Sequence, residues 1–129
     1  MLYTPHVPHI NRKQLARYIF LRTLDALDVP ASISRCVSCA GHVLRCVDVE
    51  YDLRHISDLR VIAVGKAAHG MLDGLVALLP SQMKITGVVS APTPPRKTHA
   101  GLQYFLGGHP IPNEASVRAG EAALRALQN

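Results

Sequence analysis

The sequence has no tryptophan, few aromatic residues and no long hydrophobic run. Aromatic side chains make up 5% of the 129 residues and the basic residues are scattered, so the chain lacks the basic, aromatic-rich stretches on which nucleic-acid bases stack. No segment approaches the roughly 18 apolar residues of a membrane span. Residues 1–11 are too polar and too rich in proline for a signal peptide. We therefore expect a cytoplasmic protein that binds neither nucleic acid nor a membrane.

Cysteine is also scarce, and its arrangement argues against disulfides and against a metal site. Three cysteines, an odd number, suit the cytoplasm better than a disulfide framework. Cys36, Cys39, His42 and Cys46 could ligate a metal by residue type, but all four fall within eleven residues. Structural zinc sites usually take ligand pairs from opposite arms of a loop. We therefore expect small buried thiols there and no bound metal.

The overall amino-acid composition is typical of a globular α/β domain. Hydrophobic residues make up 48% of the chain and charged residues 18%, and a chain of this length can bury a core of its own. We treat residues 1–129 as one α/β domain, in which residues 1–10, with Pro5 and Pro8, form an extended lead-in. The formal net charge of +5 suits a surface that meets phosphates, carboxylates or an acidic partner domain.

Hydrophobic periodicity and chain breakers predict alternating helices and strands. Helices are expected at residues 11–28, 31–40 and 66–79 and from residue 113 onward, and strands at 43–49, 59–64, 85–89 and 102–106. The compact apolar run at 59–64 is typical of a central parallel strand buried on both faces. The pattern predicts a three-layer, Rossmann-like α/β fold with a mostly parallel sheet flanked by helices. Such sheets bind ligands at the C-terminal ends of their strands.

The first and the last of these helices show a regular apolar stripe. Asn11 is placed to cap the first helix, and the break at Asp28-Val29-Pro30 ends it. Its predicted buried stripe consists of Ala16, Phe20, Leu24 and Leu27. The predicted inward stripe of the last helix consists of Val117, Gly120, Leu124 and Leu127.

The first candidate site is the turn at Gly65-Lys66, where a buried strand leads directly into a helix. Gly65 permits a ligand to approach the backbone, the first N–H groups of the helix point toward an anion, and Lys66 adds a positive charge. Ala67 stands where a Walker A loop would have Ser or Thr, and the G-x-G-x-x-G order of a dinucleotide turn is missing. The pattern alone indicates a phosphate or carboxylate cradle, while a solvated surface lysine is the simpler alternative.

The second candidate site is the loop from Gly107 to Ser116, which follows the predicted strand at 102–106. Two glycines and two prolines surround His109 and predict a stiff, shaped loop. Histidine can donate or accept hydrogen bonds and titrates near neutral pH. An ordinary strand-to-helix turn with its cap is the structural alternative.

The two motifs together resemble the N-terminal domain of glycerate kinases of the MOFRL-associated type, a family often named hydroxypyruvate reductase. That family typically shows a Gly-Lys-Ala turn followed by a Gly-His-Pro-x-Pro-Asp loop. Here the corresponding segments are residues 65–67 and 108–113. The similarity runs from about residue 12 to the end of the chain and includes Asp28-Val29-Pro30 and Tyr51-Asp52-Leu53.

The resemblance implies ATP- and magnesium-dependent phosphorylation of D-glycerate, a small anionic substrate. Lys66 would be the catalytic residue, because phosphoryl transfer depends on positioning and on stabilising charge on the phosphate oxygens. The other motif positions would bind substrate or nucleotide: Gly65, Ala67, His109, Asn113 and Ser116. His109 is expected to shape the substrate site rather than transfer a proton. The sequence identifies no magnesium ligand.

The sequence departs from the family pattern at two places. Asn113 stands where the family usually has Asp. The chain stops at Asn129, whereas family members continue into a Ser-Gly-Gly-rich loop and a large C-terminal domain that closes the cleft. We therefore expect a chain that is inactive alone. The sequence leaves open whether it is a fragment, a truncated reading frame or a domain whose C-terminal half is another chain, and whether it forms a homo-oligomer.

Two other functions are compatible with parts of the pattern. A non-catalytic anion-binding or interaction domain would also use a cationic turn of this kind. A hydroxypyruvate reductase would need a glycine-rich dinucleotide turn and an acidic ribose ligand, and the sequence shows no such turn.

Overall fold

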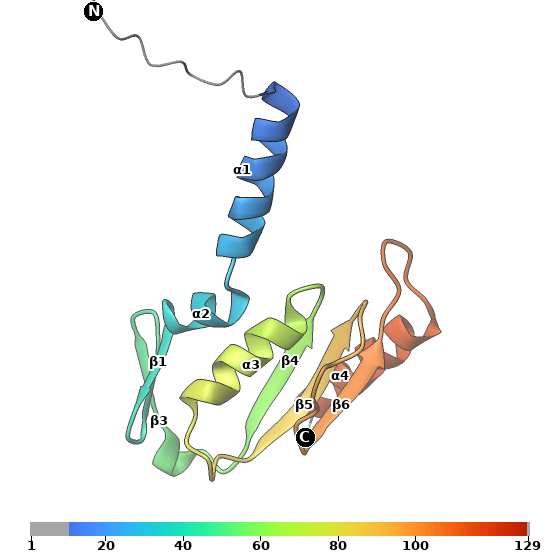
Figure 1. The fold of residues 1–129 in the computed structure, drawn as a ribbon. Coiled ribbons are helices and arrows are strands. Elements are labelled where there is room, and N and C mark those ends of the chain that lie inside the picture. The colour runs from blue at the N-terminus through green and yellow to red at the C-terminus, as the bar shows by residue number, and fades with distance from the viewer. Residues whose placement is uncertain (1–10, 129) are drawn as a thin grey trace, which may run out of the picture.

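Three parallel strands form the central sheet of the structure, a computed structural model that describes residues 11–128. In order across the sheet they are β4 (Leu59–Val64), β5 (Ile85–Ala91) and β6 (Leu102–Leu106). Helix α3 (Ala68–Leu78) packs on one face and α4 (Glu114–Gln128) on the other (Figure 1). The predicted α/β fold, a parallel sheet between helices, is confirmed. The predicted lead-in at residues 1–10 lies outside the described residues.

Strand β5 is the buried centre of this sheet. Val88 and Val89 are 1% and 0% exposed. Because they are adjacent on a strand they point to opposite faces, and Val89 packs beneath α3 while Val88 packs beneath α4. The sequence predicted a strand here but did not mark it as the central one. Thr86, Gly87 and Ser90 interrupt its apolar run, so it is less hydrophobic than β4.

Strand β4 was predicted to be central and buried on both faces, and this prediction was wrong. It lies at the end of the strand order, next to β5 alone. Val61 and Ala63 pack into the core beneath α3, whereas Ile62 and Val64 are 38% and 72% exposed. The physical reason is that α4 packs on β5 and β6 and leaves the matching face of β4 largely uncovered.

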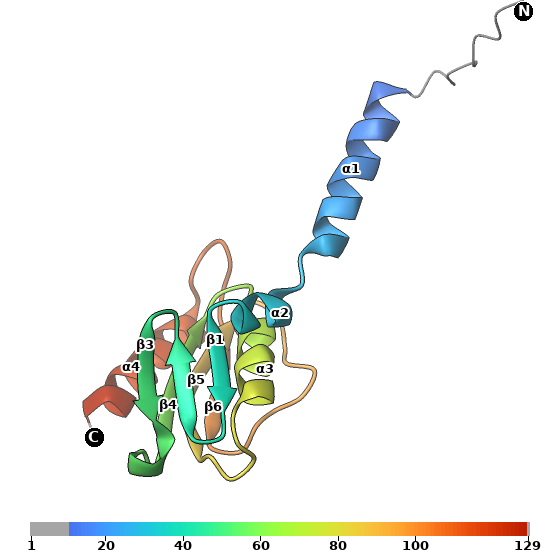
Figure 2. The same ribbon diagram turned by 90° about the vertical axis from the view of Figure 1, so that its left-hand side faces the viewer.

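An antiparallel meander precedes the parallel sheet and was not predicted as a separate sheet. It consists of β1 (Val37–Ala40), β2 (Val43–Cys46) and β3 (Val49–Asp52), in front of the other elements in Figure 2. The predicted helix at residues 31–40 was wrong from residue 35 onward. Helix α2 ends at Ser34, and residues 37–40 pair with β2 through a tight turn at Gly41, whose φ is +59°. Leu44 of the meander packs with Leu79, so the meander is joined to the end of α3.

A short 3-10 turn, η1 (Leu53–His55), connects the meander to β4. Asp52 caps it by accepting a hydrogen bond from the backbone N–H of Arg54 at 3.0 Å. The Arg54 side chain also donates to this carboxylate. Side-chain and backbone hydrogen bonds from Arg54 together hold the pKa of Asp52 well below its usual range.

The first helix, α1 (Arg12–Ala26), begins where predicted, but its apolar residues are not buried. The side chain of Asn11 accepts a hydrogen bond from the backbone N–H of Lys13 at 3.0 Å, as a cap should. Phe20 and Leu24 of the predicted buried stripe are 61% and 46% exposed. Figures 1 and 2 both show the helix extending away from the sheets. Within residues 11–128, no helix is both long and apolar enough to cross a membrane.

Helix α4 packs on the sheet through alanines rather than through its predicted stripe. Ala119 and Ala122 are buried against Val88, whereas Val117 and Leu124 are 61% and 64% exposed. Small side chains let the helix axis lie close to the strands, so the larger residues remain on the outer side. The prediction that this stripe faces inward was therefore wrong. The apolar residues do recur with helical spacing, but they lie on the outer face of α4.

Helix α2 (Val29–Ser34) is short and lies close against α3. Asp28 caps it by accepting from the backbone N–H of Ala31 at 2.9 Å, and Pro30 lies in its first turn. A Cβ added to Gly74 would lie 2.6 Å from the carbonyl oxygen of Pro30. The glycines of α3 thus allow close approach to α2.

We predict opposite effects for two helical glycine-to-alanine substitutions. Gly74→Ala should lower the free energy of unfolding by about 1–3 kcal/mol, because its new methyl group meets the backbone of Pro30. Gly120→Ala is the matched control, since a Cβ there meets nothing within 4 Å, and it should raise stability by roughly 0.5–1 kcal/mol. Urea unfolding of both variants measures this. Equal shifts of the same sign would contradict the α2–α3 contact.

Candidate functional site

The two sequence motifs lie at the carboxyl ends of strands that flank β5. The backbone N–H of Gly65, just after β4, donates to the carbonyl of Ser90 at 2.9 Å. The backbone N–H of Gly107, just after β6, donates to the carbonyl of Ala91 at 3.0 Å. The parallel ladder therefore continues one residue beyond each outer strand, and both loops leave the sheet at the same edge, where α/β sheets bind ligands.

A pocket of about 250 Å³, here called the sheet-edge pocket, lies between these loops and the start of α4. Its lining is mostly small and apolar, with Lys66 as the one charged side chain among the residues that line it. The lining residues used below are Gly65, Lys66, Ser90, Gly108, His109 and Ser116. Of the predicted site residues, Ala67 and Asn113 do not line this pocket.

Gly65 and Lys66 form the cationic side of the pocket. Gly65 has φ +107°, a conformation that strongly favours glycine. Lys66 is exposed and has no carboxylate partner within residues 11–128. Ala67 occupies the N-cap of α3 and provides no side-chain cap. The first turn of α3 therefore keeps backbone N–H groups and the positive end of its dipole beside Lys66.

Asn113 and Ser116 form a closed hydrogen-bonded turn that begins α4. The Asn113 side chain accepts from the backbone N–H of Ser116 at 3.0 Å and donates to the carbonyl of Leu106 at 3.2 Å. The Ser116 hydroxyl donates to the Asn113 side chain at 3.1 Å and accepts from the backbone N–H of Gly108 at 3.0 Å. These hydrogen bonds hold the loop after β6 against the start of α4.

His109 lines the sheet-edge pocket from the loop that follows β6. Its ring makes no hydrogen bond or ion pair with other residues of the described chain, and it precedes a cis peptide bond to Pro110. Gly108 has no room for a side chain, since a Cβ there would overlap the carbonyl of Ile111. His109 and Lys66 thus line the same pocket, and neither side chain has a hydrogen-bond or ion-pair partner within residues 11–128.

Ser90 is a site residue that the sequence pattern did not reveal. It is 8% exposed, lines the pocket, and its hydroxyl has no partner within residues 11–128. A hydroxyl that lines a pocket and has no protein partner is available to a ligand. In the sequence, Ser90 is a polar residue that ends the strand segment Gly87-Val88-Val89-Ser90. It indicates a site residue only once that strand is known to be the central one.

The described residues do not provide a magnesium site at this edge. No Asp or Glu lines the sheet-edge pocket, and magnesium prefers carboxylate and other oxygen ligands. From residue 11 to residue 128, no three His, Cys, Asp or Glu side chains are gathered closely enough to hold a metal. In the cysteine cluster Cys36 is exposed and Cys39 and Cys46 are half-buried, so the expectation of buried thiols was only partly right.

Comparison with known proteins agrees with this architecture. A family model described as a domain of unknown function, DUF4147, matches residues 15–129. Among solved structures, the crystal structure of the PH0495 protein from Pyrococcus horikoshii OT3 is similar in fold, with a TM-score of 0.68 at 21% sequence identity. The match covers 95% of this chain and 27% of that one, so the chain spans about a quarter of its length. No curated protein matches the sequence.

We predict that Asn113 acts through its cap. Asn113→Ala should lower the free energy of unfolding by about 1–2 kcal/mol, because the cap of α4 and the bond to Leu106 are lost. Asn113→Asp keeps an acceptor for the Ser116 N–H and complements the helix dipole, so it should cost less. Chemical denaturation of the two variants compares them directly. An Asp variant as unstable as the Ala variant would contradict the capping role.

Proposed function

Because the chain belongs to the DUF4147 family, we propose that it is the N-terminal part of a glycerate kinase-type phosphotransferase. The observation that carries the proposal is that an unpaired lysine, a free histidine and a free buried serine line one small pocket. The motifs that supply Lys66 and His109 are also those that resemble the glycerate kinases. A pocket of about 250 Å³ suits a three-carbon hydroxy acid better than a nucleotide.

In this proposal each free group of the pocket has a distinct role. Lys66 neutralises negative charge on the substrate carboxylate or on the transferred phosphoryl group, where a fixed cation favours the transition state. The Ser90 hydroxyl and the His109 ring orient the substrate by hydrogen bonds. Asn113 and Ser116 hold the His109 loop in place. ATP would supply the phosphoryl group.

The pocket is incomplete for catalysis as it stands. It contains no carboxylate that could ligate magnesium or accept the proton of the substrate hydroxyl. The chain also spans only 27% of the length of the PH0495 protein. We propose that a further region of a longer protein supplies these groups and closes the pocket against water.

The lack of a carboxylate also favours a second candidate function, a non-catalytic anion-binding domain. Such a domain would bind glycerate at Lys66 without transferring phosphate in any context. A nicotinamide-dependent reductase is the less favoured alternative, because the β4–α3 turn holds Gly65 and Gly70 with Lys66-Ala67-Ala68-His69 between them, not a dinucleotide fingerprint.

We predict that the chain binds D-glycerate in the sheet-edge pocket. Titration of the ¹⁵N-labelled chain should shift the amide signals of Gly65, Lys66 and Gly108. Lys66→Met should weaken binding about tenfold or more, as the loss of a charged hydrogen bond does. Lys84→Met is the matched control, because Lys84 precedes β5 at the opposite edge of the sheet. Equal affinities of the two variants would remove Lys66 from the site.

We further predict that residues 1–129 alone show negligible kinase activity. Extended by a C-terminal region that completes the pocket, the protein should release ADP from ATP in the presence of D-glycerate. Lys66→Ala in that longer protein should lower kcat/KM on the order of a thousandfold. A coupled ADP-release assay measures both. Full turnover by the short chain, or an unaffected Lys66→Ala, contradicts the proposal, and binding without turnover in the longer protein favours the non-catalytic domain.

A further inference from the structure

The connection from β5 to β6 is built without a helix. Parallel neighbours usually need a crossover of a dozen or more residues, most often containing a helix. Here residues 92–101 form the whole connection and contain Pro92, Pro94 and Pro95. This proline-rich crossover passes over the same face of the sheet as α3, since contacts from α3 and β6 hold it there.

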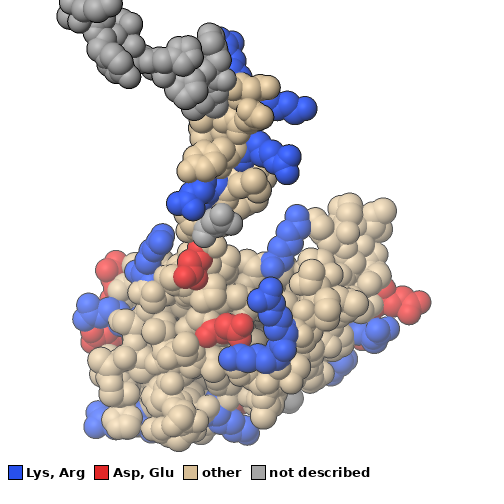
Figure 3. Space-filling model, viewed as in Figure 1, with Lys and Arg blue, Asp and Glu red and all other residues tan. Residues whose placement is uncertain are grey.

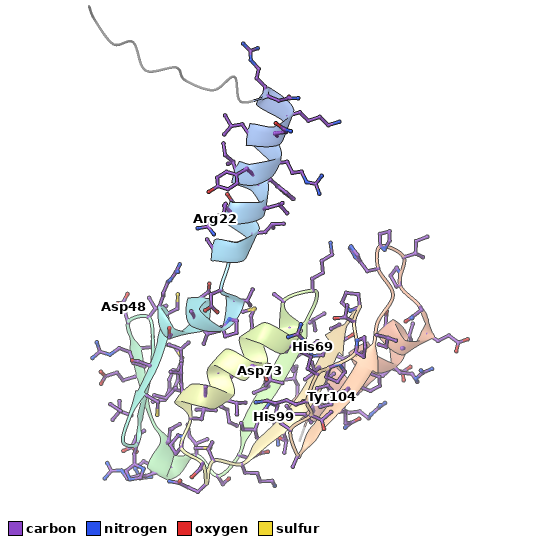
Figure 4. All side chains as sticks on the ribbon, viewed as in Figure 1. Arg22, Asp48, His69, Asp73, His99 and Tyr104 are labelled. Atoms are coloured by element: carbon purple, nitrogen blue, oxygen red, sulfur yellow. The ribbon has the colours of Figure 1, made fainter. Side chains whose placement is uncertain are left out.

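A cluster of four side chains fixes the crossover to α3 (Figure 4). The ring of His69 hydrogen-bonds the carbonyl of Thr93 at 2.8 Å and stacks on Tyr104, with 6.3 Å between ring centres. The hydroxyl of Tyr104 accepts from the backbone N–H of His99 at 2.9 Å. The ring of His99 in turn lies 3.2 Å from the carboxylate of Asp73. None of these four residues lines the sheet-edge pocket.

The fixed crossover encloses a second pocket of about 320 Å³, here called the crossover pocket. Three cationic side chains line it, namely Lys66, Arg96 and Lys97. Its one acidic lining residue, Asp73, is already engaged by His99 and by Lys97, which lies 3.8 Å away. Figure 3 shows blue side chains beside one central red patch on this face.

The charge balance of the crossover pocket is positive. Lys66 and Arg96 have no ion-pair partner in the described part of the chain, and both are exposed. Cations that lie close together repel one another, so an anion in the pocket relieves that repulsion. Arginine in particular suits the forked hydrogen bonding of a phosphate group. The crossover cluster fixes the backbone on both sides of Arg96 and Lys97, at Thr93 and His99, and both cations line the pocket together with Lys66.

We propose that the crossover pocket binds a phosphate group, on the other side of Lys66 from the sheet-edge pocket. The proposal stands independently of the reaction proposed above, because it needs only the crossover and its cations. The group is either free orthophosphate or part of a phosphate chain, and both present the same anionic oxygens. Lys66 lines both pockets and so links the two ligands.

Binding of two probes to the full 129-residue chain tests this proposal. Orthophosphate and tripolyphosphate are titrated separately into the ¹⁵N-labelled chain at constant ionic strength, because salt screens such contacts. We expect amide shifts at Thr93, Arg96 and Lys97. Arg96→Gln and Lys97→Gln should each weaken binding of at least one probe about tenfold. The probe that binds more tightly identifies the free ion or the phosphate chain as the source.

Three variants distinguish binding in the crossover pocket from a general effect of charge and from binding in the sheet-edge pocket. Arg118→Gln removes the same charge from α4 and should leave affinity unchanged. Tyr104→Phe keeps the stack on His69 but removes the acceptor for the His99 N–H, so it should weaken phosphate binding severalfold if the cluster presents the cations. His109→Ala alters only the sheet-edge pocket and should have no effect.

Two results would overturn the proposal. In the first, neither probe binds. In the second, binding is lost in His109→Ala but unchanged in Arg96→Gln and Lys97→Gln, which would place the phosphate in the sheet-edge pocket. Glycerate binding is measured separately, by its own titration, so a failure of the phosphate site is distinguishable from a failure of the proposed function.

Discussion

Parallel pairing of β5 with both of its neighbours is the interaction on which the rest of the structure depends. The register runs unbroken along β5, from Ile85 opposite Leu59 to Ala91 opposite Leu106. Gly87 permits this close pairing, because any side chain at that position would overlap the carbonyl of Val61. Since the ladder continues to the strand ends, the loops after β4 and β6 emerge together, and the sheet-edge pocket forms between them.

The two faces of this sheet are covered in different ways. On one face α3 packs with Leu72 against Val89 and leaves room for the crossover that follows β5. On the other, α4 uses alanines to lie close to Val88 and covers only part of the sheet. Polar contacts therefore concentrate on the α3 face, where a segment without regular structure must satisfy its backbone through His69 and Tyr104.

Local signals in the sequence located the turns of the site but not its complete set of residues. The Gly65-Lys66 turn and the His109 loop could be predicted because glycine, proline and a following helix mark them within a few positions. Ser90 and the cluster around Tyr104 could not, since each depends on contacts between residues far apart in the chain. Periodicity has the same limit: the stripe on α4 is present as predicted, yet Leu124 is 64% exposed. Which element covers an apolar face depends on the rest of the fold.

The separation of α1 from the sheets has a consequence for how the chain melts. A helix of 15 residues whose large apolar side chains are exposed gains little from tertiary packing, so its order follows the helix–coil equilibrium of a peptide of that length. Isolated helices of this length are marginal in water. Heating should therefore unwind α1 gradually while the parallel sheet still unfolds in one cooperative step. The loss of helical content in α1 and the unfolding of the core are then two separate transitions, each with its own free energy.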